Sequence, residues 1–160
     1  MIIVDGRKIA TNILKNIAKK KTGKKSALSV FLVGNNPASI SFIKQKERAA
    51  RDAKIKFMLH ALPSTVSKKK LTKSIKMAAK TSAVIVQLPL PKKFKNTAEI
   101  LNAVPRARDV DFLSEENLSS VSYGSKTLPP IVSAAKKVLQ KYRVALAGKN
   151  VVIFGMGRLI

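Results

Sequence analysis

The sequence predicts an α/β fold in three layers, a mainly parallel sheet flanked by helices. Short apolar runs rich in Val, Ile and Leu alternate along the chain with longer segments that carry one apolar stripe. The runs are continuous rather than alternating in polarity, which is typical of parallel strands covered on both faces. With 160 residues, of which 46% are hydrophobic, the chain can bury one domain, or one domain with part of another.

The apolar runs predict four strands, and the stripes between them predict four helices. The expected strands are 28–33 (LSVFLV), 55–62 (IKFMLHAL), 83–88 (AVIVQL) and 151–154 (VVIF). The expected helices are 7–20, 38–53, 65–80 and 130–143. A soft domain boundary is expected in the Ser-, Gly- and Pro-rich stretch 119–130.

Composition excludes several kinds of site. The chain has no cysteine and a single histidine, His60, which excludes disulfides, thiolate metal sites and histidine clusters. No stretch is apolar for long enough to cross a bilayer, and the amino terminus lacks the charged-then-apolar order of a signal peptide. We therefore expect no metal site, no membrane partner and a cytoplasmic location.

The net charge is +24, from 32 Lys and Arg against 8 Asp and Glu. A basic nucleic-acid-binding module is one interpretation, because clustered cations release counterions from a phosphate backbone. However, the lysines are spread along the whole chain, aromatic residues make up only 5%, and there is no Trp to stack on bases. A lysine coat on solvent-facing surfaces explains the charge better, and small anionic ligands are a third alternative.

One lysine breaks the amphipathic pattern of the predicted helix 38–53. At about 100° per residue, one side of this helix carries Ser39, Phe42, Ile43, Lys46, Ala50 and Ala53. Lys46 thus lies within the apolar face. Either its stem packs at the edge of the face while its amine reaches water, or the amine is held in a cleft for proton transfer or ligand binding.

Two further features point to the carboxyl ends of the strands, where the ligands of parallel sheets gather. Gln87 interrupts an apolar run just before Pro89 and Pro91, and a buried amide is costly unless protein or ligand pairs with it. The stretch 108–112 (RDVDF) places two of the few acids one residue apart. These acids either form local ion pairs or belong to a site.

Four segments, taken together and in this order, resemble the bifunctional methylenetetrahydrofolate dehydrogenase / methenyltetrahydrofolate cyclohydrolase family. They are 33–50 (VGNNPASISFIKQKERAA), 84–91 (VIVQLPLP), 108–111 (RDVD) and 148–160 (GKNVVIFGMGRLI). The likeness covers essentially the whole chain, although the family's chains are much longer. It implies a tetrahydrofolate-binding catalytic domain over residues 1–122. Over 123–160 it implies the first helix and strand of a Rossmann-like NADP-binding domain, incomplete here.

The resemblance implies NADP-dependent oxidation of 5,10-methylenetetrahydrofolate and hydrolysis of the methenyl product to 10-formyltetrahydrofolate. The family's catalytic lysine falls on Lys46, the glutamine that sets this lysine and contacts substrate on Gln87, and the aspartate that binds the pterin ring on Asp111. The other implied substrate positions are Ser39, Phe42, Leu88 and Pro89. The family forms homodimers through its cofactor domains. We expect the 160-residue chain by itself to lack dehydrogenase activity.

The resemblance implies a cofactor loop at Gly155, Met156 and Gly157. These residues match the start of Gly-x-Gly-x-Leu-Val rather than Gly-x-Gly-x-x-Gly. This loop looks interrupted at the end of the chain.

Three positions depart from the family. Phe42 stands where the family usually has tyrosine, and it remains a candidate catalytic position. Phe112 replaces a glycine that allows a close turn, and Met156 replaces an arginine suited to a cofactor phosphate. Phe42 and Phe112 leave open a non-catalytic remnant that only binds folate or dimerises.

Overall fold

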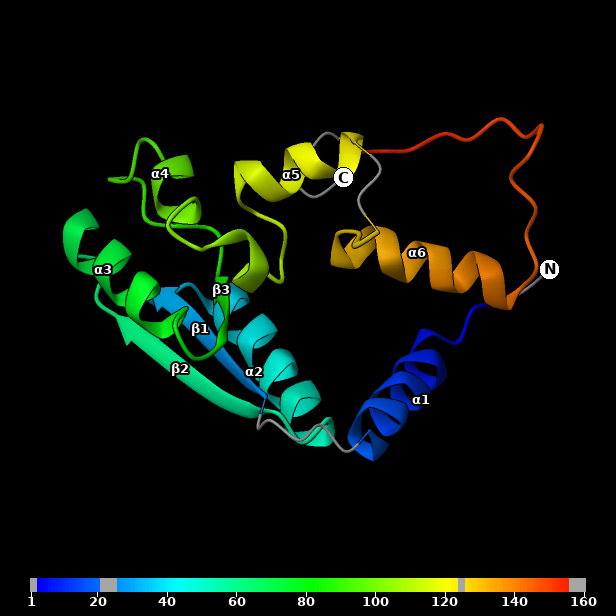
Figure 1. The fold of residues 1–160 in the computed structure, drawn as a ribbon, viewed down its shortest axis with the longest axis horizontal. Helices are drawn as coiled ribbons and strands as arrows, with labels where there is room; N and C mark the ends of the chain where they lie inside the picture. Colours follow the sequence, from blue (N-terminus) through cyan, green and yellow to red (C-terminus); the bar gives the residue numbers. More distant parts are fainter. Residues whose placement is uncertain (1–2, 21–25, 124–125, 156–160) are drawn as a thin grey trace.

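The computed structural model describes residues 3–20, 26–123 and 126–155. Its elements in chain order are α1 (Gly6–Lys19), β1 (Ala27–Val33), α2 (Pro37–Asp52), β2 (Lys56–Leu62), α3 (Lys68–Ala78), β3 (Ala83–Val86), α4 (Ala98–Leu101), the 3-10 helix η1 (Arg106–Arg108), α5 (Glu115–Ser122) and α6 (Pro130–Lys141). The alternation of strands and helices confirms the predicted α/β class (Figure 1).

The sheet consists of three parallel strands in the order β2-β1-β3. In its register, Val30 of the central strand lies between Leu59 of β2 and Ile85 of β3. Because all three strands run the same way, their carboxyl ends meet at one edge of the sheet. This edge is where α2 begins and where the chain leaves β3.

Helices cover both faces of the sheet, so the three-layer arrangement is confirmed. On one face, Phe31 and Val33 pack against α3 through Leu71 and Ile75, with α4 extending the same cluster. On the other face, Val30, Leu32 and Ile85 pack against Ile43 of α2. The alternation of inward and outward side chains along β1 sends neighbouring residues to opposite faces. The continuous apolar run of β1 thus supplies both halves of the core.

The predicted strands 28–33, 55–62 and 83–88 are confirmed as β1, β2 and β3, although β3 ends at Val86, before Gln87 and Leu88. The four predicted helices are confirmed as α1, α2, α3 and α6, each within a few residues of its expected ends. The short elements α4, η1 and α5 were not predicted, since none is long enough to show an apolar stripe. The edge strand β2 is half-exposed rather than buried on both faces.

The strand predicted at 151–154 is wrong, because these residues form no strand. A strand needs a neighbour for its N–H and C=O groups, and nothing in the described ranges pairs with this segment. Its four side chains are 61% to 92% exposed. An apolar β-branched run thus predicts strand propensity, while pairing decides whether the strand forms.

Helices α1 and α6 meet at one point away from the sheet (Figure 1). The hydroxyl of Tyr142 accepts a hydrogen bond from Asp5 N at 3.3 Å and donates one to Ile3 O at 3.4 Å. None of the described helices is both long and apolar enough to span a membrane. The same ranges hold no group of three or more His, Cys, Asp or Glu side chains suited to a metal ion.

Candidate active site

The start of α2 fixes the first part of the site. Asn36 caps this helix by accepting a hydrogen bond from Ser39 N at 3.0 Å, and Pro37 takes the first helical position, where its missing N–H costs nothing. The helix therefore begins directly beyond the carboxyl end of β1. Ser39 and Lys46 lie seven residues apart and share one side of the helix. The cap fixes where the helix begins, and thereby the positions of both residues.

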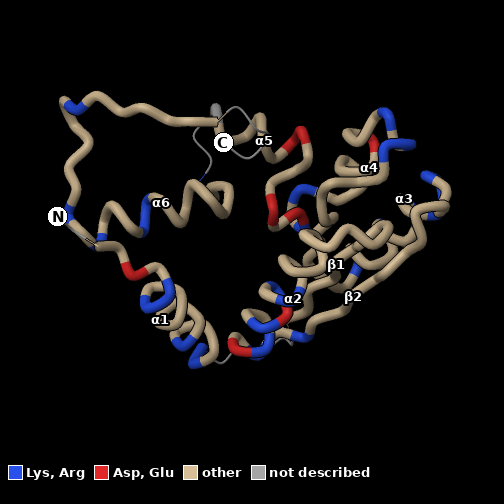
Figure 2. The backbone as a smooth tube through the Cα atoms, turned by 180° about the vertical axis from the view of Figure 1, so that it is seen from behind, with Lys and Arg blue, Asp and Glu red and all other residues tan. Residues whose placement is uncertain are grey.

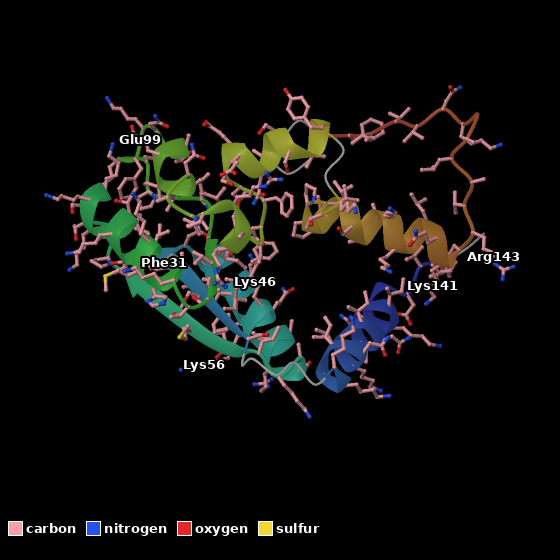
Figure 3. The ribbon with its side chains drawn as sticks, in the orientation of Figure 1. Phe31, Lys46, Lys56, Glu99, Lys141 and Arg143 are labelled. Atoms are coloured by element: carbon pink, nitrogen blue, oxygen red, sulfur yellow. The ribbon has the colours of Figure 1, made fainter. Side chains whose placement is uncertain are left out.

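Lys46 forms an ion pair with Asp111. The distance from Lys46 Nζ to Asp111 Oδ2 is 2.8 Å, and the two side chains are 29% and 24% exposed. The pair joins α2, where Figure 3 labels Lys46, to the segment that follows η1. The anomalous lysine of the helix pattern is thus paired inside a partly buried site.

Two side chains converge on the carbonyl oxygen of Leu88. Ser39 Oγ donates to it at 3.2 Å and Gln87 Nε2 at 2.8 Å, and the Leu88–Pro89 peptide is cis. The loop after β3 is thereby tied to the first turn of α2. Because Gln87 uses its amide nitrogen for this contact, its Oε1 atom is left buried with no hydrogen-bond donor among the described residues. Such an orphaned acceptor is costly in a protein interior, and a ligand N–H would satisfy it.

The two acids of the 108–112 stretch have different surroundings. Asp109 is 5% exposed and accepts hydrogen bonds from Leu113 N, from Ser114 N and Oγ, and from Asn117 Nδ2. It is a structural anchor for the turn into α5. Asp111 alone reaches Lys46. The sequence leaves open whether these acids form local ion pairs or belong to a site. Among the described residues Asp109 pairs with no cation, and Asp111 pairs with a lysine on a distant helix, so a role of Asp111 in the site stays a prediction.

Both phenylalanine departures lie next to the ion pair. Phe42 is 57% exposed and precedes Lys46 by one helical turn. Phe112 directly follows Asp111, has a φ of +57° and is 7% exposed. The left-handed backbone agrees with the expectation that this position favours glycine. At Phe112 the left-handed backbone is unfavourable for a residue with a side chain, whereas burial of the aromatic ring is favourable.

Hollows in the surface adjoin these residues on two sides. One, of about 490 Å³, lies where β1 and β3 end and is lined by residues that include Asn36, Pro37 and Pro89. Another, of about 440 Å³, is lined by residues that include Asp109, Val110 and Phe112. Neither Lys46 nor Asp111 lines these two hollows, which border the site through Pro89 and Phe112.

Of the three cofactor residues expected from the sequence, the structure describes Gly155. Met156 and Gly157 lie outside the described residues. Gly155 is exposed, with a φ of +133°, and the segment 144–155 runs as an irregular trace from the end of α6 toward α5 (Figure 1).

Comparison with known proteins assigns the chain to a family. The family model described as tetrahydrofolate dehydrogenase/cyclohydrolase, catalytic domain, matches residues 4–111, more than half of the chain. The chain belongs to this family. Ser39, Phe42, Lys46, Gln87, Leu88, Pro89 and Asp111 all lie within the matched range.

Family relatives match the whole length of the chain. The bifunctional protein FolD of Nautilia profundicola is 31% identical over 100% of this chain and 59% of its own length. That of Rickettsia canadensis is 34% identical over 99% of this chain and 58% of its own length. The chain therefore spans under two thirds of these relatives.

Solved structures from the family share the fold. The bifunctional enzyme FolD (methylenetetrahydrofolate dehydrogenase/cyclohydrolase) from Campylobacter jejuni superimposes with a TM-score of 0.89 at 28% identity, over 98% of this chain and 58% of that one. The Trypanosoma brucei FolD structure, complexed with NADP cofactor and inhibitor, superimposes with a TM-score of 0.89 at 23% identity, over 99% of this chain and 57% of that one. At this identity the likeness is one of fold.

Lysines are spread over the surface of this family member. Figure 2 shows Lys and Arg along α1, α2, α3 and α6. This distribution agrees with a lysine coat on solvent-facing surfaces.

Proposed function

We propose that this protein is a folate-dependent enzyme of one-carbon metabolism. Its reactions are the NADP-dependent oxidation of 5,10-methylenetetrahydrofolate and the hydrolysis of 5,10-methenyltetrahydrofolate to 10-formyltetrahydrofolate. The observation that carries the proposal is the contact between Lys46 and Asp111 in a chain matched to the family over 4–111. A pterin ring presents adjacent N–H donors, which suit a carboxylate, and the reacting carbon needs a group that moves protons.

Three side chains divide the work of hydrolysis. Asp111 accepts hydrogen bonds from the N–H groups of the pterin ring and orients it, and the orphaned Gln87 Oε1 accepts a further donor from the ligand. Water adds to the cationic methenyl carbon and loses one proton, for which Lys46 is the proposed acceptor. The bond from this carbon to N5 then breaks as the remaining hydroxyl loses its proton and N5 gains one. The products are a formyl group on N10 and one released proton.

The described residues do not build a cradle for NADP. Residues 151–154 form no strand and Gly155 is exposed, so the turn that would approach a pyrophosphate is not shaped there. We propose NADP as the oxidant because the chain belongs to this family and the related Trypanosoma brucei structure is complexed with it. For the 160-residue chain by itself we expect no NADPH formation from methylenetetrahydrofolate. Robust NADPH production would contradict this expectation.

Calorimetric titration with a tetrahydrofolate analogue tests the proposal. We expect the protein to bind the analogue, and Lys46→Ala and Asp111→Ala each to weaken binding by at least tenfold. Lys44→Ala and Asp52→Ala are matched controls, because they remove one charge of each sign from exposed positions of α2. Absence of binding, in this chain and in any longer form of the protein, would refute the assignment.

Three finer proposals accompany this function. We propose that the protein pairs as a homodimer, which sedimentation of the purified protein would test. The division into a catalytic domain over 1–122 and a second domain from 123 is also a proposal, and limited proteolysis near 119–130 would test it. The cytoplasmic location expected from the sequence stays a prediction.

A further inference from the structure

We propose that a lysine-rich surface next to the candidate site is a binding subsite for the tail of a polyglutamylated folate. This tail subsite consists of Lys68, Lys92, Lys93 and Lys95, which line two neighbouring hollows. The inference rests on the proposed function and adds to it the class of folate that the protein binds best.

The two hollows lead from the candidate site to these lysines. The hollow of about 490 Å³ that borders the site through Pro89 is also lined by Lys92, three residues further along the chain, which is at most about 11 Å away. The next hollow, of about 460 Å³, begins at Lys93. The neighbouring segment shows the same order, with Ser64 in the first hollow and Val66 in the second. A ligand bound at the site therefore reaches the lysines by extending along the surface.

The tail subsite lies in a region of locally unbalanced positive charge. Residues 63–70 and 89–96 contain six lysines and no Asp or Glu, and all six lysines are exposed. Figure 2 shows Lys and Arg gathered beside α3 and α4. Glu99 of α4 pairs with Lys68, while no other carboxylate of the described residues pairs with the lysines of this region. Most of this charge is therefore available to an anionic ligand.

Internal contacts hold the lysine-bearing loop in place. Lys93 Nζ donates a hydrogen bond to Val66 O at 2.7 Å and lies 4.9 Å from the centre of the Phe94 ring. The N–H of Phe94 donates to Pro91 O at 3.0 Å, which closes a turn. The loop is thus tied to the segment before α3, and an ordered loop loses less entropy when a ligand binds.

The chemistry of a folate tail fits this surface. The tail consists of an aminobenzoyl group and one or more γ-linked glutamates, so a monoglutamate carries two carboxylates and a pentaglutamate six. Each exposed pair of carboxylate and lysine contributes about twofold to affinity, and the pairs act together because the bound ring tethers the tail. A nucleic acid fits less well, since Phe94 is 8% exposed and offers no open face on which a base could stack.

Calorimetric titration with the monoglutamate and pentaglutamate forms of 5-formyltetrahydrofolate measures the contribution of the tail. At low salt we expect the protein to bind the pentaglutamate about tenfold more tightly. In about 0.5 M NaCl this ratio should fall toward one, because the Debye length shrinks to about 4 Å and exposed pairs are screened. Equal affinities at low salt would overturn the subsite while the proposed function stands. If neither form binds, the subsite and the proposed function fail together.

A double variant tests whether the proposed lysines are responsible. Lys92→Ala combined with Lys95→Ala should lower the ratio of the two affinities from about tenfold to about twofold to threefold. Both forms carry the same ring, so this ratio is insensitive to any change in ring binding. Lys15→Ala combined with Lys19→Ala removes two exposed lysines from α1 and should leave the ratio near the wild-type value. An unchanged ratio in the first variant, or an equal fall in both, would overturn the subsite.

Discussion

Asp109 and Asp111 are two residues apart, yet Asp109 is buried within a network of hydrogen bonds and Asp111 reaches across to Lys46 on α2. The first carboxylate stabilises the turn, and the second forms an ion pair from it. This separation predicts that removing one charge affects folding and removing the other affects ligand binding.

Asp109→Asn should lower the free energy of unfolding by about 2–3 kcal/mol. The amide has the shape of the carboxylate but turns an N–H group toward donors such as Ser114 N, which leaves buried polar groups without partners. Asp111→Asn should cost less than about 1 kcal/mol, because its ion pair is partly solvated. Urea denaturation measures both, and equal losses would contradict the division of roles.

Lys54 and Phe112 have nearly the same backbone, with φ of +58° and +57°, but opposite exposure. Lys54→Gly should raise the free energy of unfolding by up to about 1 kcal/mol, because glycine relieves the left-handed strain at an exposed position. Phe112→Gly should lower it by about 2–4 kcal/mol, because the lost burial of the ring exceeds the relief. Thermal denaturation of the two variants should therefore shift in opposite directions. Stabilisation by both substitutions would show that burial of the Phe112 ring contributes little to the free energy of unfolding.

A buried polar relay under α3 gives a further prediction. Ser82 Oγ donates to Ala78 O at 2.8 Å and lies 2.9 Å from Ser29 Oγ, which lies 3.2 Å from His60 Nε2. Ser82→Ala leaves the fully buried Ser29 without one of its partners and should cost about 1–2 kcal/mol in urea denaturation. Ser119→Ala, at an exposed position, is the matched control and should cost less than about 0.5 kcal/mol. An equal loss of unfolding free energy in Ser119→Ala and Ser82→Ala would show that burial of the hydroxyl does not decide its contribution to stability.

The sequence was informative wherever a local pattern decides the structure. Apolar runs predict β1, β2 and β3, and the helical pattern marks Lys46 as the charged residue on the apolar face of α2. The family resemblance named the site residues, and the family model confirmed the family itself. The roles of these residues stay predictions.

Contacts between distant segments decided the rest. No local signal separates Asp109 from Asp111, because one binds the turn that follows it and the other binds a helix 65 residues away. The orphaned Gln87 Oε1 depends on where the amide nitrogen finds its acceptor. The strand expected at 151–154 failed for the same reason, since pairing requires a neighbour that no local pattern reports.

Phe42→Tyr tests whether the missing hydroxyl limits catalysis. The ring is 57% exposed one turn from Lys46, so the added oxygen reaches water and the free energy of unfolding should change by less than about 0.5 kcal/mol. If the family's tyrosine orients the reacting carbon or the attacking water, cyclohydrolase turnover should rise about tenfold or more. The assay follows the loss of methenyl absorbance under saturating substrate.

Phe154→Tyr adds the same hydroxyl to an exposed ring outside the site and should leave turnover unchanged. Turnover indistinguishable from the solvent reaction in both variants and in the wild type would favour a folate-binding remnant over an enzyme.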